Sequence, residues 1–352
     1  MHSNSRQKWL IFTLISLVGV IFLTACNLGT TKESTTPLSR TEFLLGTVTT
    51  ISLYDHQSEE ILDLAIEKLK ALEDTLSINK TGTLIDKIND AAGIHPVVVD
   101  ESTYDVIEKG LTYSELTDGA FDITVGPIVK LWNIGFPEAR VPNPTEIEHA
   151  LPLIGFDKVI LNPNDLSVYL TEPGMRLDLG GIGKGYAADE IAKLLRQNGV
   201  EHAIIDLGGN VYTLGNKPGD QLWTVGVQDP FNPRGKVIGR LKAENKSIVT
   251  SGIYERFVED EAGNQYHHIL NPKTGYPYEN QIAGVTIVSD SSADGDALST
   301  AVFAMGIEEG LSFVESLEGI DAIFITLDSK VYVTDGLKDN FVLSNESFTM
   351  AN

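Results

Sequence analysis

Two residues one helical turn apart carry the clearest chemical signal in the sequence. Asp296 and Thr300 lie at positions i and i+4 of a segment that predicts a helix over about residues 295–305, so their side chains share one helix face. A carboxylate beside a hydroxyl supplies the hard oxygen ligands that Mg²⁺ prefers. Helix capping by Ser292 or Asp294 explains the polar start of this segment, but it explains the Asp296–Thr300 pair less well.

A glycine-rich turn precedes a second predicted helix, over residues 184–198. Residues 176–189 read RLDLGGIGKGYAAD, in which a short strand leads through the turn into the helix. Backbone N–H groups at such a turn bind phosphate, and Lys184 would place a positive charge on a pyrophosphate. A P-loop requires Ser or Thr where this chain has Gly185, and the dinucleotide glycine spacing fails at Tyr186. The turn alone therefore fits either a phosphate site or a plain strand-to-helix connection.

Two later turns also carry polar side chains. An apolar strand ends at Asp206 and two glycines, which fits either a ligand-facing turn or an aspartate-capped hairpin. Another strand ends with His267 and His268, before the sequence ILNPKTG. Because neighbouring strand residues face opposite sides, only one of these histidines can face a given site. The pair is therefore a poor candidate for a shared metal site.

The elements that position these turns predict an α+β fold in one compact domain over residues 41–346. Apolar residues recur on one face of a predicted helix over 57–76, and a further helix is predicted over 102–117. Short strands predominate between residues 202 and 288, including one over 254–259. Runs of strands with interspersed helices indicate mixed and antiparallel sheets, not a regular βαβ series.

The amino terminus predicts export and lipid attachment. Arg6 and Lys8 precede an apolar run over residues 10–23, which is shorter than the roughly 20 residues of a membrane-spanning helix. Residues 1–25 are interpreted as a lipoprotein signal peptide, and Cys26 as the cysteine that is diacylated after cleavage. The alternative is a plain amino-terminal membrane anchor with an incidental cysteine. The polar residues 26–40 are predicted to be a flexible tether.

The composition excludes several functional classes. The chain has 26 Lys and Arg against 49 Asp and Glu, which gives a net charge of −23. Such a surface repels nucleic-acid backbones and disfavours adhesion to anionic lipid surfaces. Since the sequence has a single cysteine, it contains neither an internal disulfide nor a cysteine-based metal site.

Taken together, the four segments resemble the FAD:protein FMN transferase (ApbE-type) family, in its exported lipoprotein form. The resemblance runs from LGT at 45–47 to the final hairpin, and it includes GAFDITVGP at 119–127 and LW at 131–132. It implies an ApbE-like domain that transfers FMN from FAD, with Mg²⁺, to a Thr or Ser hydroxyl of an exported acceptor protein. The product would be a phosphoester, with release of AMP. The enzyme would be anchored through Cys26 at the extracytoplasmic face of a bacterial cell membrane.

The resemblance also implies a role for each matching residue. The residues that would contact FAD are Leu45, Ala120, Phe121, Asp122, Asp178, Lys184, His268 and Ile269. The carbonyl of Gly181, the carboxylate of Asp296 and the hydroxyl of Thr300 would hold Mg²⁺. Either His268 or Asp296 would take the proton from the acceptor hydroxyl. The chain departs from the family pattern at Leu45, Asn271 and Gly183, but no presumed metal ligand is lost.

Three other functions use the same residues differently. A hydrolase would use water as the acceptor and give FMN and AMP from FAD. A non-catalytic flavin-binding lipoprotein has no need for the Asp296–Thr300 pair. An NAD-dependent oxidoreductase is disfavoured by the broken glycine spacing and by the absence of a βαβ series.

Overall fold

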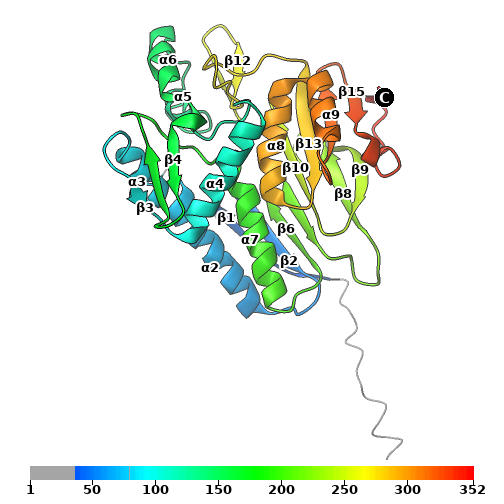
Figure 1. Ribbon diagram of the computed structural model, residues 1–352. Helices are drawn as coiled ribbons and strands as arrows, with labels where there is room; N and C mark the ends of the chain where they lie inside the picture. The colour runs from blue at the N-terminus through cyan, green and yellow to red at the C-terminus, as the bar shows by residue number, and fades with distance from the viewer. Residues whose placement is uncertain (1–35, 79) are drawn as a thin grey trace, which may run out of the picture. The chain divides into compact units, whose positions relative to one another are not determined.

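A twisted, largely antiparallel sheet organises the part of the chain that the computed structural model describes, residues 36–78 and 80–352. In these residues nine strands pair in the order β1-β2-β6-β7-β10-β13-β14-β15-β17, and only β15 and β17 run parallel (Figure 1). The strands are β1 (Leu38–Leu44), β2 (Thr47–Leu53), β6 (Ala203–Leu207), β7 (Asn210–Leu214), β10 (Lys246–Gly252), β13 (Ile282–Ser289), β14 (Asp321–Thr326), β15 (Lys330–Val333) and β17 (Thr349–Met350). The predicted signal peptide and Cys26 lie outside the described residues.

Four helices pack against one face of this sheet: α2 (Glu59–Leu76), α7 (Gly183–Gln197), α8 (Ser292–Met305) and α9 (Ile307–Glu315). Helix α2 begins after Ser58, whose hydroxyl accepts hydrogen bonds from the backbone N–H groups of Glu60 and Ile61. Its apolar residues recur every three or four positions and are buried against the sheet. Helix α7 lies between α2 and α8, so the sheet places the amino-terminal halves of α7 and α8 next to each other.

A second, three-stranded sheet covers part of the opposite face. It contains β8 (Trp223–Gln228), β9 (Val237–Ala243) and β16 (Val342–Leu343). Its apolar side chains share a core with those of β10, β13, β14 and β15. Every residue of β13 is buried, because this strand is covered on one face by α8 and α9 and on the other by the small sheet.

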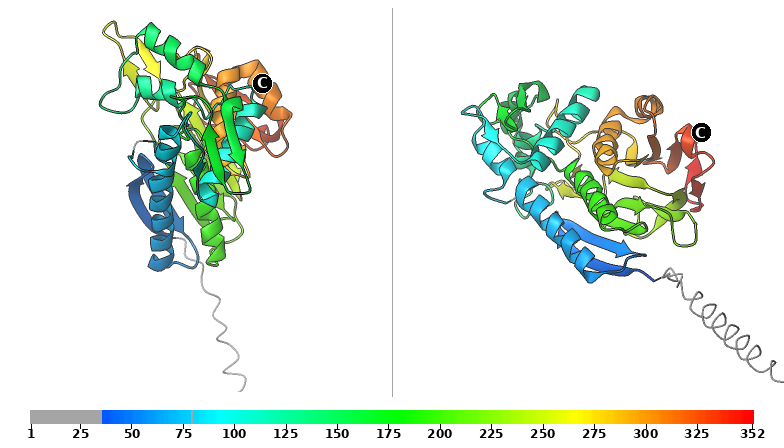
Figure 2. Two further views of the ribbon diagram at one scale, coloured as in Figure 1. Left: turned by 60° about the vertical axis from the view of Figure 1, so that its left-hand side comes forward. Right: turned by 60° about the horizontal axis from the view of Figure 1, so that its bottom comes forward.

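The remaining elements gather beyond one end of the main sheet (Figures 1 and 2). They are α3 (Leu84–Asp90), α4 (Glu101–Leu116), α5 (Gly126–Trp132), α6 (Pro144–Ala150), the sheet of β3 (Val97–Val98), β5 (Ser167–Leu170) and β4 (Val159–Asn162), and the hairpin of β11 (Phe257–Glu259) and β12 (Gln265–His267). Two 3₁₀ helices, η1 (Leu151–Leu153) and η2 (Phe156–Lys158), belong to this group, whereas η3 (Asp335–Leu337) packs with β14 in the core of the small sheet. Helices α5 and α6 pack with the hairpin around the buried Trp132.

The structure confirms the predicted α+β class and corrects the domain limits. Residues 38–40, assigned to the tether, are the first residues of β1. The folded unit runs from Thr36 to Asn352, because β17 pairs with β15 and Asn352 bonds to the backbone of Val333. Among the described residues, none of the helices has the length and apolar character to cross a membrane.

Candidate active site

Helices α7 and α8 meet near their amino-terminal ends, and two residues of α7 fix this contact. A Cβ at Gly185 would lie 2.2 Å from the carbonyl oxygen of Ser292, so only glycine permits the approach. The carboxylate of Asp189 accepts hydrogen bonds from the backbone N–H groups of Ser292 (2.7 Å) and Ala293 (3.0 Å), and it thereby caps α8. Burial raises the pKa of Asp189, while these hydrogen bonds oppose the rise.

Asp296 lies one turn into α8 and faces the glycine-rich turn that precedes α7. Its side chain is only 4% exposed. Asp296 Oδ2 accepts a hydrogen bond from the Gly185 N–H at 3.0 Å, and Oδ1 lies 3.2 Å from Lys184 Nζ. The ammonium of Lys184 also donates to the Gly180 carbonyl at 3.3 Å. A positive charge is thus held between a carboxylate oxygen and a carbonyl oxygen of the turn.

The three residues predicted as metal ligands lie together at this turn. Thr300 lies one helical turn beyond Asp296, and its Oγ1 is 3.6 Å from the position that a Cβ of Gly181 would occupy. The candidate donors are a carboxylate, a hydroxyl and a backbone carbonyl, an all-oxygen set that suits Mg²⁺. The ammonium already held by Asp296 and Gly180 shows that this position favours a cation. The residues present therefore fit a divalent metal ion.

A second group of potential metal ligands lies in the loops after β2 and before β6. Ligand atoms of Asp55, Glu201 and His202 lie within 4.8 Å of one another. The carboxylate of Asp55 accepts hydrogen bonds from the backbone N–H groups of Glu201 and His202, both at 2.9 Å. His202 Nδ1 lies 2.8 Å from the carbonyl oxygen of Asn216. These hydrogen bonds, which join the two loops, account for the closeness of the three side chains.

The two neighbouring histidines have different surroundings, because His267 is the last residue of β12 and His268 follows it in a bend. His267 Nε2 donates to the carbonyl of Tyr278 at 2.9 Å, and its Nδ1 accepts from the Ile269 N–H at 3.2 Å, so His267 supports the fold. His268 is half-buried, and its Nδ1 lies 3.3 Å from the carbonyl oxygen of Arg256. Burial and the charge of Arg256 lower the pKa of His268 to about 3. The imidazole of His268 is therefore neutral at physiological pH.

The residues predicted to line FAD are only partly assembled around the turn. Asp178 lies two residues before Gly180 and accepts its N–H at 2.7 Å; burial raises the Asp178 pKa. The ring of Phe121 packs against Gly181. The carboxylate of Asp122 instead bonds to the N–H and hydroxyl of Thr124, at 2.8 and 2.6 Å. In this structure Asp122 thus stabilises its own loop.

The other three residues predicted to contact FAD differ in their burial and in their hydrogen bonds. Leu45 is half-buried in the β1–β2 turn at a φ of 55° and donates its N–H to Glu73. Ala120 is half-buried, and its carbonyl accepts from the Tyr278 hydroxyl at 3.3 Å. Ile269 is 4% exposed and packs with α8 in the core. Its side chain therefore does not line the site, and its backbone N–H and carbonyl bond to His267 Nδ1 and to the Tyr278 N–H.

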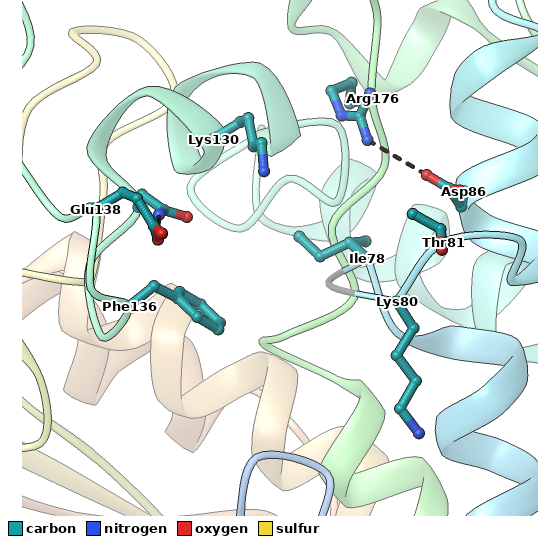
Figure 3. A pocket seen from close by; sticks show the side chains of 9 residues that line it. Ile78, Lys80, Thr81, Asp86, Lys130, Phe136, Glu138 and Arg176 are labelled. Atoms are coloured by element: carbon teal, nitrogen blue, oxygen red, sulfur yellow. Dashed lines mark hydrogen bonds and ion pairs between the residues drawn. The ribbon is translucent and has the colours of Figure 1, made fainter.

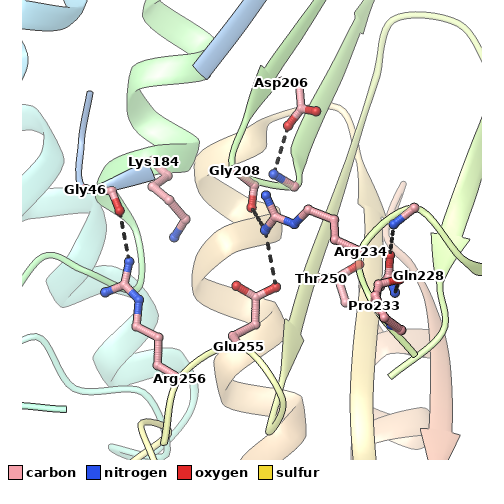
Figure 4. Close-up of polar contacts among 12 residues, drawn as sticks. Gly46, Lys184, Asp206, Gly208, Gln228, Pro233, Arg234, Thr250, Glu255 and Arg256 are labelled. Atoms are coloured by element: carbon pink, nitrogen blue, oxygen red, sulfur yellow. Dashed lines mark hydrogen bonds and ion pairs between the residues drawn. The ribbon is translucent and has the colours of Figure 1, made fainter. Parts of the chain in front are cut away.

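The structure adds three charged residues that the sequence did not single out (Figure 4). Glu255 and Arg256 lie in a turn before β11, within the segment predicted as a strand over 254–259. Arg234, between β8 and β9, donates to the Gly208 carbonyl at 3.0 Å and lies 3.9 Å from Glu255. Burial raises the pKa of Glu255, and the charges of Arg234, Lys184 and Arg256 oppose the rise. These residues belong to no motif, so only their three-dimensional position reveals them.

A pocket of about 300 Å³ is lined in part by Asn133 and Phe136, which flank the Gly135 loop that contacts Arg256 (Figure 3). Its lining includes Ile78, Phe136 and the side chain of Arg176, which is two residues before Asp178. Arg176 lies 3.9 Å from Asp86 across the pocket wall. An apolar side chain at each side and several charged groups at the rim suit a flat ring that carries polar substituents.

Comparisons with known proteins agree on one family. A family model described as the ApbE family matches residues 45–324, a range that includes all the site segments. Two curated relatives, each named FAD:protein FMN transferase, come from Klebsiella pneumoniae and Treponema pallidum. The first is 41% identical over 83% of this chain and 90% of the relative, and the second is 36% identical over 95% and 97%.

Solved structures give the same result. The ApbE protein of Thermotoga maritima has a TM-score of 0.78 and 34% identity over 86% of this chain and 98% of its own. The flavin transferase ApbE of Vibrio cholerae has a TM-score of 0.75 and 25% identity over 86% and 99%. Each of these relatives and structures therefore matches more than four fifths of the chain.

Proposed function

The chain belongs to the ApbE family and transfers FMN from FAD to protein, and we propose that it does so with Mg²⁺ and onto a Thr or Ser hydroxyl of an exported acceptor. The convergence of Gly181, Lys184, Asp296 and Thr300 where α7 meets α8 carries the proposal. It places one ammonium group and an all-oxygen donor set beside a glycine-rich turn. Such a constellation suits a pyrophosphate.

The proposed reaction is a substitution at phosphorus. The acceptor oxygen forms a bond to the FMN-side phosphorus of FAD, the bond from that phosphorus to the bridging oxygen breaks, and AMP leaves with the electron pair. The acceptor proton passes to a base. A bound Mg²⁺, held by Gly181, Asp296 and Thr300, would neutralise charge on the pyrophosphate. Lys184 adds a second positive charge at the same place.

The base in this proposal is His268. Asp296 uses both carboxylate oxygens for Gly185 and Lys184, and it is a presumed metal ligand, so it is poorly placed to take a proton. His268 is neutral, and a proton on Nδ1 directed at the Arg256 carbonyl leaves Nε2 as the acceptor. An anionic substrate nearby would raise the low pKa of His268 towards the useful range.

We further propose that one ring system of FAD occupies the pocket of Ile78, Phe136 and Arg176. Arg176 joins this pocket to the turn at Gly180 through the segment 176–180. A dinucleotide that bridges the two places would put its pyrophosphate beside Lys184. The pocket volume of about 300 Å³ is at the lower end of that found for small-molecule sites.

The transfer is tested by intact mass. The protein is incubated with FAD, Mg²⁺ and a candidate exported acceptor, and a parallel sample contains EDTA. We expect the acceptor to gain one FMN group, AMP to appear in equal amount, and both to be lost with EDTA. Release of AMP and free FMN without a gain in mass would favour FAD hydrolysis. Full transfer in EDTA-treated, metal-free protein would refute the metal requirement.

We also propose that diacylated Cys26 anchors the enzyme at the extracytoplasmic face of a bacterial membrane. The support is the basic start, the short apolar run and the small residues before Cys26. In cells fed a labelled fatty acid, the protein should carry the label and sediment with membranes. Cys26→Ser should remove the label. Equal labelling of the Cys26→Ser variant would reject the proposed attachment site.

A further inference from the structure

We propose that Arg256 binds a phosphate group of FAD, together with Lys184 on the facing turn. The inference rests on the proposed function, because it assumes that FAD is the substrate at this site. Arg256 is exposed and comes from a turn before β11 that carries no recognised motif. Figure 4 shows its guanidinium directed towards the same region as the Lys184 ammonium.

The Arg256 side chain is held in place by two glycines. Its Nη2 donates to the carbonyl of Gly46, in the β1–β2 turn, at 3.4 Å. Its aliphatic part lies on Gly135, where a Cβ would come within 2.9 Å of Arg256 Cδ. Gly135 has a φ of +93°, so the loop both requires glycine and leaves room for the arginine. A guanidinium positioned in this way loses less entropy when an anion binds.

The charge of Arg256 acts on the same groups as that of Lys184. Both cations influence the carboxylates of Asp178 and Glu255 and the imidazole of His268. Yet the structure gives Arg256 no ion pair within residues 36–78 and 80–352, although acidic residues greatly outnumber basic ones. The guanidinium therefore remains available for an anionic ligand. Its planar set of N–H donors matches phosphate oxygens.

The place of Arg256 also fits the middle of a dinucleotide. Gly135, which contacts the arginine, lies between Asn133 and Phe136 of the pocket wall. Lys184 lies next to Asp296, on the side of Arg256 away from the pocket. FAD has a ring system at each end and its phosphates between them. With one ring in the pocket and the pyrophosphate at Lys184, Arg256 lies along the path between them.

Binding measurements on Arg256→Gln test the inference without a transfer reaction. Flavin fluorescence gives the affinities of the purified protein for FAD, FMN and riboflavin, and competition with FAD gives that for AMP. Because one charge-assisted contact is lost, FAD should bind about 10- to 100-fold more weakly. Riboflavin, which has no phosphate, should bind within about twofold of wild type. Weaker FMN or weaker AMP binding identifies which phosphate Arg256 contacts.

Two further variants separate phosphate binding from a structural role. Arg256→Lys keeps the charge and should retain most of the FAD affinity. Arg196→Gln removes another exposed guanidinium, which lies in the last turn of α7 and donates to the Tyr212 hydroxyl at 3.0 Å, and should leave FAD binding nearly unchanged. The inference is overturned if Arg256→Gln binds FAD as wild type does, if the affinity for riboflavin is weakened as much as that for FAD, or if Arg196→Gln weakens FAD binding as much as Arg256→Gln does. Wild-type protein that binds FAD but transfers no FMN would refute the proposed function and leave this inference standing.

Discussion

Replacement of Asp296 by asparagine should abolish transfer with only a modest loss of stability. The amide oxygen can still accept the Gly185 N–H, whose bond to Asp296 measures 3.0 Å. The charge on the partly exposed Lys184 loses its partner at 3.2 Å, a change that costs up to about 1 kcal/mol for such pairs. With a weakened hydrogen bond to the buried oxygen, the total is about 1–2 kcal/mol. Thermal unfolding should therefore shift by a few degrees at most.

The effect of Asp296→Asn on the rate should be far larger. The variant removes a presumed metal ligand, and we expect AMP release to fall at least about a hundredfold, equivalent to about 2.7 kcal/mol. Initial rates at fixed FAD and acceptor, over a series of Mg²⁺ concentrations, measure this change. Asp294→Asn is the matched control, because Asp294 lies on the same helix and pairs with Lys109 at 2.7 Å. The reasoning fails if Asp296→Asn keeps a third of the wild-type rate, or if Asp294→Asn loses as much.

Two further changes test other parts of the structure. Gly185→Ala should destabilise the protein by about 3 kcal/mol or more, since its Cβ would meet the backbone of α8 at 2.2 Å. Gly183→Ala, whose Cβ would have no contact closer than 3.9 Å, should be neutral or stabilising. Equal urea midpoints for the two variants would contradict the packing argument. Protonation of Asp178, Asp189 and Glu255, whose pKa values burial raises, favours the folded state at low pH. The contribution of His268 to stability should nevertheless fall as the pH drops below about 6.5, because its low folded pKa makes the unfolded chain bind the proton more tightly. Burial also lowers the pKa of His267, which therefore acts in the same direction as His268. His268→Gln should remove only part of the difference between the urea midpoints measured at pH 7 and pH 5. If that difference is unchanged, the low pKa is wrongly assigned to His268.

The local parts of the site could be read from the sequence because they depend on short-range geometry. The pairing of Asp296 with Thr300 follows from the helical repeat. Strand alternation predicts different surroundings for His267 and His268, although β12 ends at His267. The glycine-rich turn likewise predicted where α7 begins. However, the contact between Lys184 and Asp296 joins residues 112 positions apart. Only the packing of α7 against α8, which Gly185 permits, brings those residues together.

The segment around Arg256 shows why other parts were missed. Residues 254–259 have the composition of a strand, but β10 ends at Gly252, where a Cβ would lie 2.3 Å from the ring of Tyr254. The chain therefore turns before β11 begins and presents Glu255 and Arg256 to the site. The side chain of Ile269, which the resemblance places at FAD, packs in the core. Burial of a single residue is decided by the tertiary packing, which the local pattern does not contain.

The balance of charge supports the proposal that a metal ion assists pyrophosphate binding at this site. The net charge of −23 repels an anionic substrate, although physiological salt screens that repulsion beyond about 8 Å. Binding must therefore depend on charges within the site. There the carboxylates of Asp178, Glu255 and Asp296 offset the cations Lys184, Arg234 and Arg256, which act on the same groups. The side chains alone thus leave little net positive charge, and a divalent cation on the oxygen ligands of α8 and the glycine-rich turn would supply what the phosphates require.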